Sequence, residues 1–187
     1  YEVPYNNKVG ALLRLIDYHG FKLGIIFCNT QRMVDELTDT LQAQGFSADR
    51  LHGGIPQAQR TRVMDKFKQA RFEFLVATDV AARGIDVDDL ELVVNYDLPY
   101  DSEDYVHRIG RTGRAGRKGM AITFVSGREI YKLSFIERFM RTRIHRGKLP
   151  TTGEIEEKRT DQMLQKVRTI LEGDSFVEVV LNTTPAE

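Results

Sequence analysis

Short apolar runs alternate with helical patterns along the first 150 residues of this 187-residue sequence. The runs lie at residues 23–27, 48–51, 72–78, 91–96 and 120–125. Continuous apolar character is typical of parallel strands that helices cover on both faces. Strands that alternate with helices at this spacing predict an α/β fold with a doubly wound parallel sheet.

The segments between these runs carry helix start and stop signals. Thr30 can cap a helix that Gly45 ends, and Pro56 suits the first turn of the following helix. Further helical patterns cover residues 9–16 (ended by Gly20), 102–109 and 128–141. Ligands of such sheets bind in loops beyond the carboxyl ends of the strands. We therefore expect functional residues in the loops at 28–32, 52–60, 77–86 and 95–99.

The character of the sequence changes after residue 150. Residues 151–154 read as a linker turn, residues 155–172 as a charged helix, and residues 175–182 as a weakly alternating strand. We predict one domain over residues 1–150 and an extension over residues 151–187, which leads into a further domain. The extension is also a candidate dimerisation segment.

Charge is balanced overall, with 27 basic and 27 acidic residues, but it is unevenly distributed. Residues 79–104 hold nine acidic residues and one arginine, whereas residues 108–118 and 138–148 each hold five cations and no acid. The sequence therefore contains two basic segments although its net charge is zero. The second segment, residues 138–148, either extends a surface that binds nucleic acid or forms a solvated loop.

The remaining composition argues against several classes of protein. Cys28 is the only cysteine, so no disulfide forms within the chain, and it reads as a small buried apolar residue. The sequence holds no apolar run long enough to span a membrane, no signal peptide and no metal-binding cluster. We expect a cytoplasmic setting.

Glycine and arginine each recur at every third position within residues 108–117, RIGRTGRAGR. A collagen triple helix also has glycine at every third position, but it needs prolines that this segment lacks. A disordered Arg-Gly tract and a solvated basic loop are the other structural interpretations. The segment lies between an expected helix and an expected strand, which argues against disorder.

Together with its neighbours, this repeat resembles a known set of motifs. HRIGRTGRAGR (107–117) is similar to the sixth motif of DEAD-box ATP-dependent RNA helicases, which belong to helicase superfamily 2. IIFCNT (25–30), LHGGIPQAQR (51–60), VATDVAARGIDV (76–87) and VNYDLP (94–99) resemble other motifs of that family in the same order. The resemblance covers residues 1–150 and implies the second, carboxy-terminal RecA-like domain, of a bacterial type.

The resemblance implies roles in ATP hydrolysis. Arg111 and Arg114 match arginine fingers, which stabilise the charge that develops on the γ-phosphate. A guanidinium suits this role because its planar fork can bind two oxygens and stays charged. Asp86 matches the ribose contact beside Gly84, although a turn or helix cap is its structural alternative.

The resemblance also implies contacts to RNA and to a partner domain. Residues expected at the RNA sugar-phosphate backbone are Thr30, Gly53, Gly54, Gln57, Arg60 and Thr78. His107, Arg108 and Asp79 are expected to couple the motif to the partner domain. Asp79 can also orient the arginines, and Arg83 can pair with Asp79 or Asp86. A set of phosphate contacts without base-reading groups predicts binding that is independent of RNA sequence.

Two family motifs are missing from the sequence. It contains neither the phosphate-binding loop G-x-x-x-x-G-K-[ST] nor a D-E-A-D box. We therefore expect a fragment of a longer chain, whose amino-terminal RecA-like domain holds the rest of the ATP site and most of the Mg²⁺ ligands. The alternatives are a non-catalytic RNA- or protein-binding module with this fold, and a related helicase that acts on DNA.

Overall fold

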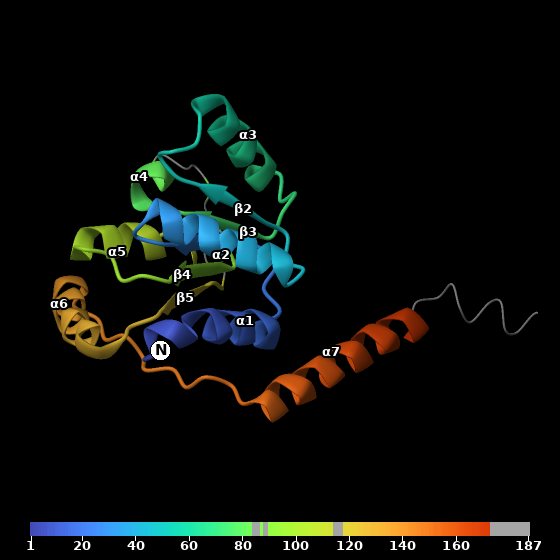
Figure 1. Ribbon diagram of the computed structural model, residues 1–187. Helices are drawn as coiled ribbons and strands as arrows, with labels where there is room; N and C mark the ends of the chain where they lie inside the picture. The colour runs from blue at the N-terminus through green and yellow to red at the C-terminus, as the bar shows by residue number, and fades with distance from the viewer. Residues whose placement is uncertain (84–86, 88–89, 114–117, 173–187) are drawn as a thin grey trace, which may run out of the picture.

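The computed structural model of this chain describes residues 1–83, 87, 90–113 and 118–172. A parallel sheet forms its centre (Figure 1). Its strands are β1 (Gly24–Phe27), β2 (Ala48–Leu51), β3 (Phe74–Ala77), β4 (Leu92–Asn95) and β5 (Met120–Thr123), in the order β2-β3-β1-β4-β5. Each neighbouring pair is parallel and in register over four residues. The predicted doubly wound parallel sheet is confirmed.

The helices of the described chain are α1 (Lys8–His19), α2 (Gln31–Ala43), α3 (Gln57–Lys68), α4 (Asp79–Ala82), α5 (Ser102–Ile109), α6 (Ile130–Met140) and α7 (Thr152–Glu172). Gly20 ends α1 with a φ of 70°, and the Thr30 hydroxyl accepts a hydrogen bond from the Met33 N–H at the start of α2. Both boundaries were predicted. The short helix α4 was not, because four residues carry no helical period.

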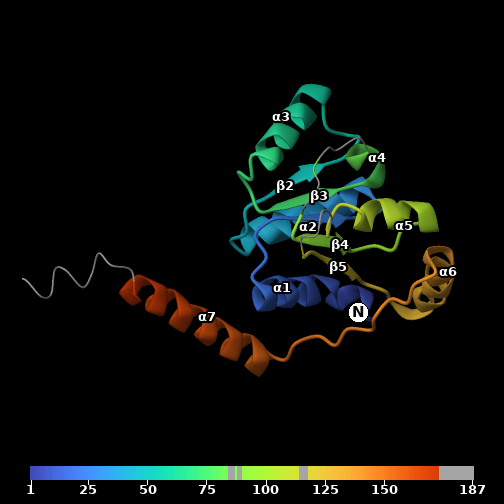
Figure 2. The same ribbon diagram turned by 180° about the vertical axis from the view of Figure 1, so that it is seen from behind.

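Two helical layers cover the sheet, because successive strand residues point to opposite faces. Ile26 packs with α1 and α2 on one face, whereas Ile25 and Phe27 pack with α3 on the other. Figures 1 and 2 show α1 and α3 on opposite sides of the strands. A smaller cluster under α5 and α6 contains Tyr105 and Ile136. The helices α4, α5 and α6 lie along one side of the molecule, near the carboxyl ends of the strands.

Helix α7 extends away from the sheet (Figures 1 and 2). Its beginning is attached to α1, where Arg159 Nη2 lies 2.8 Å from Asp17 Oδ2, and Ile155 is buried. The helix begins at Thr152, earlier than predicted, because Thr151 and Glu154 cap each other. The strand predicted at 175–182 lies outside the described residues. Within the described residues, no helix has both the length and the apolar character needed to cross a membrane.

Candidate functional site

Arg108 lies at the carboxyl edge of the sheet, where the loops after β1, β3 and β4 meet. It projects from α5, and its side chain is only 1% exposed. Nε and Nη2 each donate to Asp79, over 2.6 Å to Oδ1 and 2.6 Å to Oδ2. Nη1 donates to Asn95 Oδ1 (3.1 Å) and to the Asp97 carbonyl (2.7 Å), and Nη2 also donates to Asn29 Oδ1 (3.1 Å). All five guanidinium N–H groups are therefore used.

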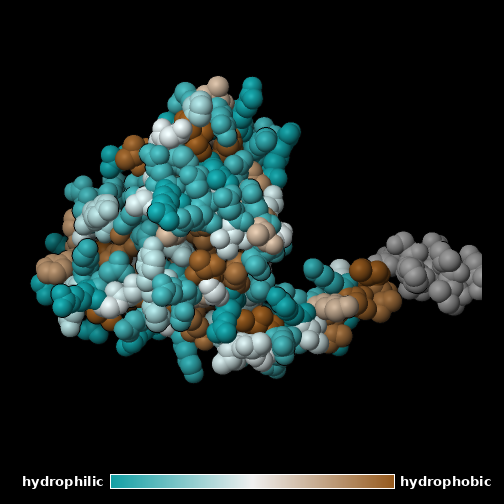
Figure 3. All heavy atoms as spheres, in the orientation of Figure 1, coloured by the Kyte–Doolittle hydropathy of each residue, from teal (hydrophilic) through white to brown (hydrophobic). Residues whose placement is uncertain are grey.

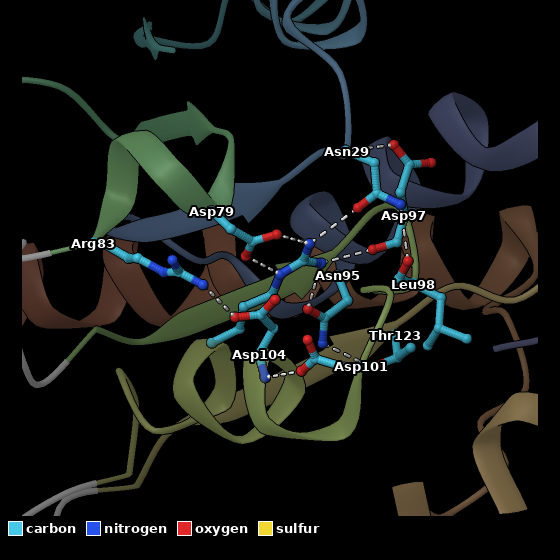
Figure 4. Close-up of polar contacts among 10 residues, drawn as sticks. Asn29, Asp79, Arg83, Asn95, Asp97, Leu98, Asp101, Asp104 and Thr123 are labelled. Carbon is cyan, nitrogen blue, oxygen red and sulfur yellow. Dashed lines mark hydrogen bonds and ion pairs between the residues drawn. The ribbon is translucent and has the colours of Figure 1, made fainter. Parts of the chain in front are cut away.

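The partners of Arg108 come from three neighbouring strands. Asn29 follows β1, Asp79 follows β3 and Asn95 ends β4, and Figure 4 shows these three side chains converging on one point. The guanidinium also lies over the Phe27 ring, 5.0 Å from its centroid. Arg108 thus anchors α5 to the centre of the sheet.

A second buried cation extends this network toward the amino terminus. Lys8, 1% exposed, donates from Nζ to the Tyr96 carbonyl (2.9 Å) and lies 3.4 Å from Asp97 Oδ1. The other carboxylate oxygen of Asp97 accepts from the Asn29 N–H at 3.0 Å. The start of α1 is therefore connected to the partners of Arg108.

Burial, followed by the nearby Asp97 charge, raises the pKa of the Cys28 thiol well above its ordinary value.

A pocket of about 260 Å³ opens beside the Arg108–Asp79 pair. Its lining includes Arg83, Asp104, His107 and Arg111. Arg83 Nη2 donates to Asp104 Oδ1 over 3.2 Å, while Asp79 binds Arg108. The suggested pairing of Arg83 with Asp79 is therefore wrong, because the buried Arg108 takes both carboxylate oxygens. The pocket brings the expected finger Arg111 together with the expected coupling residues.

Three of the expected nucleotide contacts lie outside the described residues. They are Gly84, Asp86 and Arg114. Arg111 is described and half-buried at the pocket, two residues beyond Ile109, where α5 ends.

The residues expected at RNA occupy the neighbouring strand ends. Thr30 follows β1, Gly53 and Gly54 follow β2, Thr78 follows β3, and Gln57 and Arg60 lie in the first turn of α3. Within the described residues, Arg60 makes two long contacts, from Nη1 to Gln57 Oε1 (3.3 Å) and from Nη2 to the Ala81 carbonyl (3.4 Å). Its Nε is buried and, in the part of the chain that is described, has no hydrogen-bond partner. Such an unsatisfied buried donor is unfavourable and is found at binding sites.

In the loop after β2, Gly54 lies close to two side chains. A Cβ there would lie 2.8 Å from Gln31 Oε1 and 3.1 Å from the His52 ring. The Gly54 N–H donates to His52 Nδ1 (3.1 Å), so the ring proton sits on Nε2, which faces Asp35 Oδ1 at 3.1 Å. Gly53 and Gly54 are both exposed in this loop.

Sequence reasoning missed four polar residues of this edge. They are Lys8, Asn29, Asn95 and Asp97. Asn29, Asn95 and Asp97 lie in loops that were singled out, and a polar residue directly at the end of an apolar strand was their available signal. Among the described residues, no group of three or more His, Cys, Asp or Glu side chains is placed to hold a metal ion.

Residues 7–116 match the model of the helicase conserved C-terminal domain. The chain belongs to this helicase C-terminal domain family. The DEAD-box ATP-dependent RNA helicase CshA of Bacillus licheniformis is 46% identical over 175 residues, which are 94% of this chain and 36% of the relative. The chain thus spans about a third of the length of that helicase.

Solved structures agree with this assignment. A DEAD box protein from Methanococcus jannaschii is 48% identical with a TM-score of 0.73, over 79% of this chain and 40% of that chain. The C-terminal domain of the DEAD-box protein Dbp5 is 35% identical with a TM-score of 0.74, over 84% of this chain and 93% of that chain. The S. cerevisiae Dbp5 structure with RNA and ADP BeF3 is 35% identical with a TM-score of 0.72, over 86% and 42% of the two chains. This helicase domain is therefore a RecA-like domain of the DEAD-box type.

Proposed function

We propose that this domain is the second RecA-like half of a cytoplasmic ATP-dependent RNA helicase and completes an ATP site between two domains. The observation that carries the proposal is the pocket at the carboxyl edge of the sheet. It gathers Arg83, His107 and Arg111 around the buried Arg108–Asp79 pair. Guanidinium groups held on a rigid support suit the oxygens of a triphosphate.

In this proposal Arg111 and Arg114 stabilise the γ-phosphate of ATP during hydrolysis. Asp86 accepts hydrogen bonds from the ribose hydroxyls, and Gly84 leaves room beside it. Arg111 can act without reorganisation because α5, which precedes it, is fixed through Arg108. The amino-terminal domain of the parent helicase supplies the phosphate-binding loop and most of the Mg²⁺ ligands.

The RNA strand runs over the loops after β1, β2 and β3. Arg60 contacts phosphate, which would satisfy its buried Nε, and Gly53 and Gly54 allow the backbone to approach closely. Thr30, Gln57 and Thr78 supply further hydrogen bonds to the sugar-phosphate backbone. The Dbp5 structure with RNA and ADP BeF3 supports RNA binding by this domain, because that protein shares the fold at 35% identity.

ATP and RNA are both bound between two domains in this scheme, so each favours closure of the cleft. Closure completes the γ-phosphate site and bends one RNA strand, which opens a short duplex locally. His107 faces the partner domain from the pocket, while Arg108 and Asp79 transmit the contact by holding α5 in place. Self-association through residues 151–187 is a separate proposal, which light scattering tests.

Replacing Arg111 by Ala in the full-length helicase tests the finger role. We expect RNA binding to be kept and RNA-stimulated ATP turnover to fall by about 10³- to 10⁵-fold, since an arginine finger contributes on that order. The measurements are phosphate release and RNA affinity on the same preparation. Arg71→Ala is the matched control, because Arg71 is exposed between α3 and β3 and should leave turnover unchanged. Near-normal turnover of the Arg111 variant would refute the finger role.

A further inference from the structure

The outer face of α6 carries three exposed aromatic side chains. Tyr131, Phe135 and Phe139 are 71%, 62% and 53% exposed. They are four residues apart, so they form one stripe along the helix. The opposite face of α6 packs inward through Leu133, Ile136 and Met140. The aromatic stripe is therefore not required by the core of the domain.

Exposed cations flank the stripe and continue after it. They are Arg128, Lys132, Arg138, Arg141 and Arg143, and in the described part of the chain none of them forms an ion pair. The guanidinium of Arg138 lies over the Phe135 ring, 5.5 Å from its centroid. The two acids of this segment have other partners. Glu129 accepts from Ser126, and Glu137 accepts from the Ile144 N–H at 2.8 Å. The surface around the aromatic rings is consequently cationic.

A charged residue adopts an unfavourable backbone conformation at the end of α6. Arg141 ends the helix with a φ of 54°. This left-handed conformation is costly for a residue with a Cβ, and helices usually place glycine there. Arginine at this position keeps a cation at the end of the stripe in spite of the strain. A residue that opposes the local conformation points to a functional constraint.

We infer that the outer face of α6, together with the basic segment after it, binds single-stranded RNA. Aromatic rings flanked by cations are the means by which proteins bind single strands without reading the sequence, since every base can stack on a ring. The choice of RNA as the ligand rests on the proposed function. The surface itself is additional to the loops after β1, β2 and β3. It lies on the same side of the fold as α4 and α5 (Figures 1 and 2).

The chemistry of α6 favours RNA over a protein partner. Helix α7 also exposes apolar side chains, but these are Met163, Leu164, Val167, Ile170 and Leu171, all of them aliphatic. Figure 3 shows the hydrophobic surface near the outer end of α7. Aliphatic side chains offer no flat ring to a base. The planar rings and surplus positive charge of α6 match a strand of stacked bases and phosphates.

Binding of a fluorescein-labelled single-stranded oligouridine to the 187-residue chain, followed by fluorescence anisotropy at several salt concentrations, tests the inference. The double variant Phe135→Ala/Phe139→Ala should weaken binding at least about fivefold, because each base that stacks on a ring adds about that factor or more. The salt dependence of that variant should stay unchanged, since no cation is removed. The matched control Met163→Ala/Leu164→Ala removes comparably exposed side chains from α7 and should leave the affinity unchanged.

Arg141→Gly separates loss of charge from loss of folding. Glycine relieves the left-handed strain, so the thermal midpoint should stay the same or rise. The affinity should nevertheless fall, and the slope of log affinity against log salt should become shallower by about 0.7, the contribution of one phosphate contact in a single strand. Circular dichroism checks that each variant is folded.

Arg60→Ala distinguishes this inference from the proposed function. Weaker binding by the α6 variants together with normal binding by Arg60→Ala would support the α6 surface and contradict the proposed RNA loops. The reverse pattern would overturn the inference and leave α6 as a protein-docking face. Absence of RNA binding by the unsubstituted chain at low salt would overturn it as well.

Discussion

Arg108 and Arg111 belong to one sequence repeat but occupy different environments. Arg108 is buried, with its five N–H groups bonded within the domain, whereas Arg111 is half-buried at the pocket. The three-residue period alone does not distinguish the two arginines. Their environments differ because the helix α5 ends at Ile109, between them. The first arginine points back into the sheet, and the second follows the turn beyond the helix.

The Arg108–Asp79 pair should be important for stability. Asp79→Asn removes the charge that compensates the buried guanidinium, and breaking such a pair destabilises a protein by about 3–5 kcal/mol. Urea denaturation of the chain measures the change. Asp104→Asn is the matched control, since its partner Arg83 is 71% exposed and the pair should contribute about 1 kcal/mol or less. Equal effects of the two substitutions would contradict the role assigned to Arg108.

Cys28 should make the stability of the domain depend on alkaline pH. Burial raises the pKa of its thiol above the ordinary value, so the folded state keeps the proton that the unfolded state loses. The free energy of unfolding should therefore decrease as pH rises above about 8.5, by up to about 1.4 kcal/mol per pH unit. Urea titrations between about pH 8 and pH 10 measure this slope. Cys28→Ala should flatten it, and an identical slope in the variant would exclude Cys28 as the cause.

At the scale of elements, β1 is the centre of the domain, because it pairs with both β3 and β4. Its end places Phe27 and Asn29 beside Arg108, so the position of β1 determines the geometry of the pocket. The strand starts at Gly24, where a Cβ would lie 3.0 Å from both the carbonyl oxygen and the Cβ of Leu92 in β4. The spacing between these two strands therefore depends on a glycine.

Two glycine substitutions should have opposite effects on stability. Gly24→Ala should destabilise the domain by about 1–3 kcal/mol, the usual cost of overpacking a core, since the Leu92 backbone cannot move freely. Gly10→Ala in α1 should stabilise it by about 0.5–1 kcal/mol, because no neighbouring atom lies within 4 Å of the added Cβ and alanine favours helix. Thermal denaturation compares the two variants. A loss of stability in both would show that the close approach at Leu92 is not the cause.

At the scale of the whole molecule, the pocket opens at the edge of the domain, and its expected ligand would lie between two domains. The helicase CshA of Bacillus licheniformis is nearly three times as long as the matched region, as its 36% coverage implies. In the proposed function, this domain supplies the arginine fingers, and the other domain supplies the cradle that holds their substrate.

The isolated chain should therefore hydrolyse essentially no ATP, with or without RNA. The physical reason is that arginine fingers act only on a nucleotide that other groups hold in place. A phosphate-release assay on the 187-residue chain measures this, with the full-length helicase as the positive control. Robust RNA-stimulated hydrolysis by the chain alone would contradict the half-site proposal.

The sequence by itself determined the sheet, its parallel strands and most of the helix boundaries. The reason is that burial and capping are local, so apolar runs such as residues 23–27 and caps such as Thr30 leave a direct signal. The motif resemblance gave Arg111 and His107 separate roles, and both residues line the same pocket. The short helix α4 was not predicted, since four residues are too few to display a helical period.

Only the tertiary structure decided which charges pair. Asp79 lies 29 positions from Arg108, and Asn29 lies 79 positions away, so no spacing in the sequence relates them. The pairing arises because parallel strands bring their carboxyl ends to one edge, where a buried guanidinium must find a partner for each N–H. Sequence thus specifies the elements, and packing selects the contacts between them.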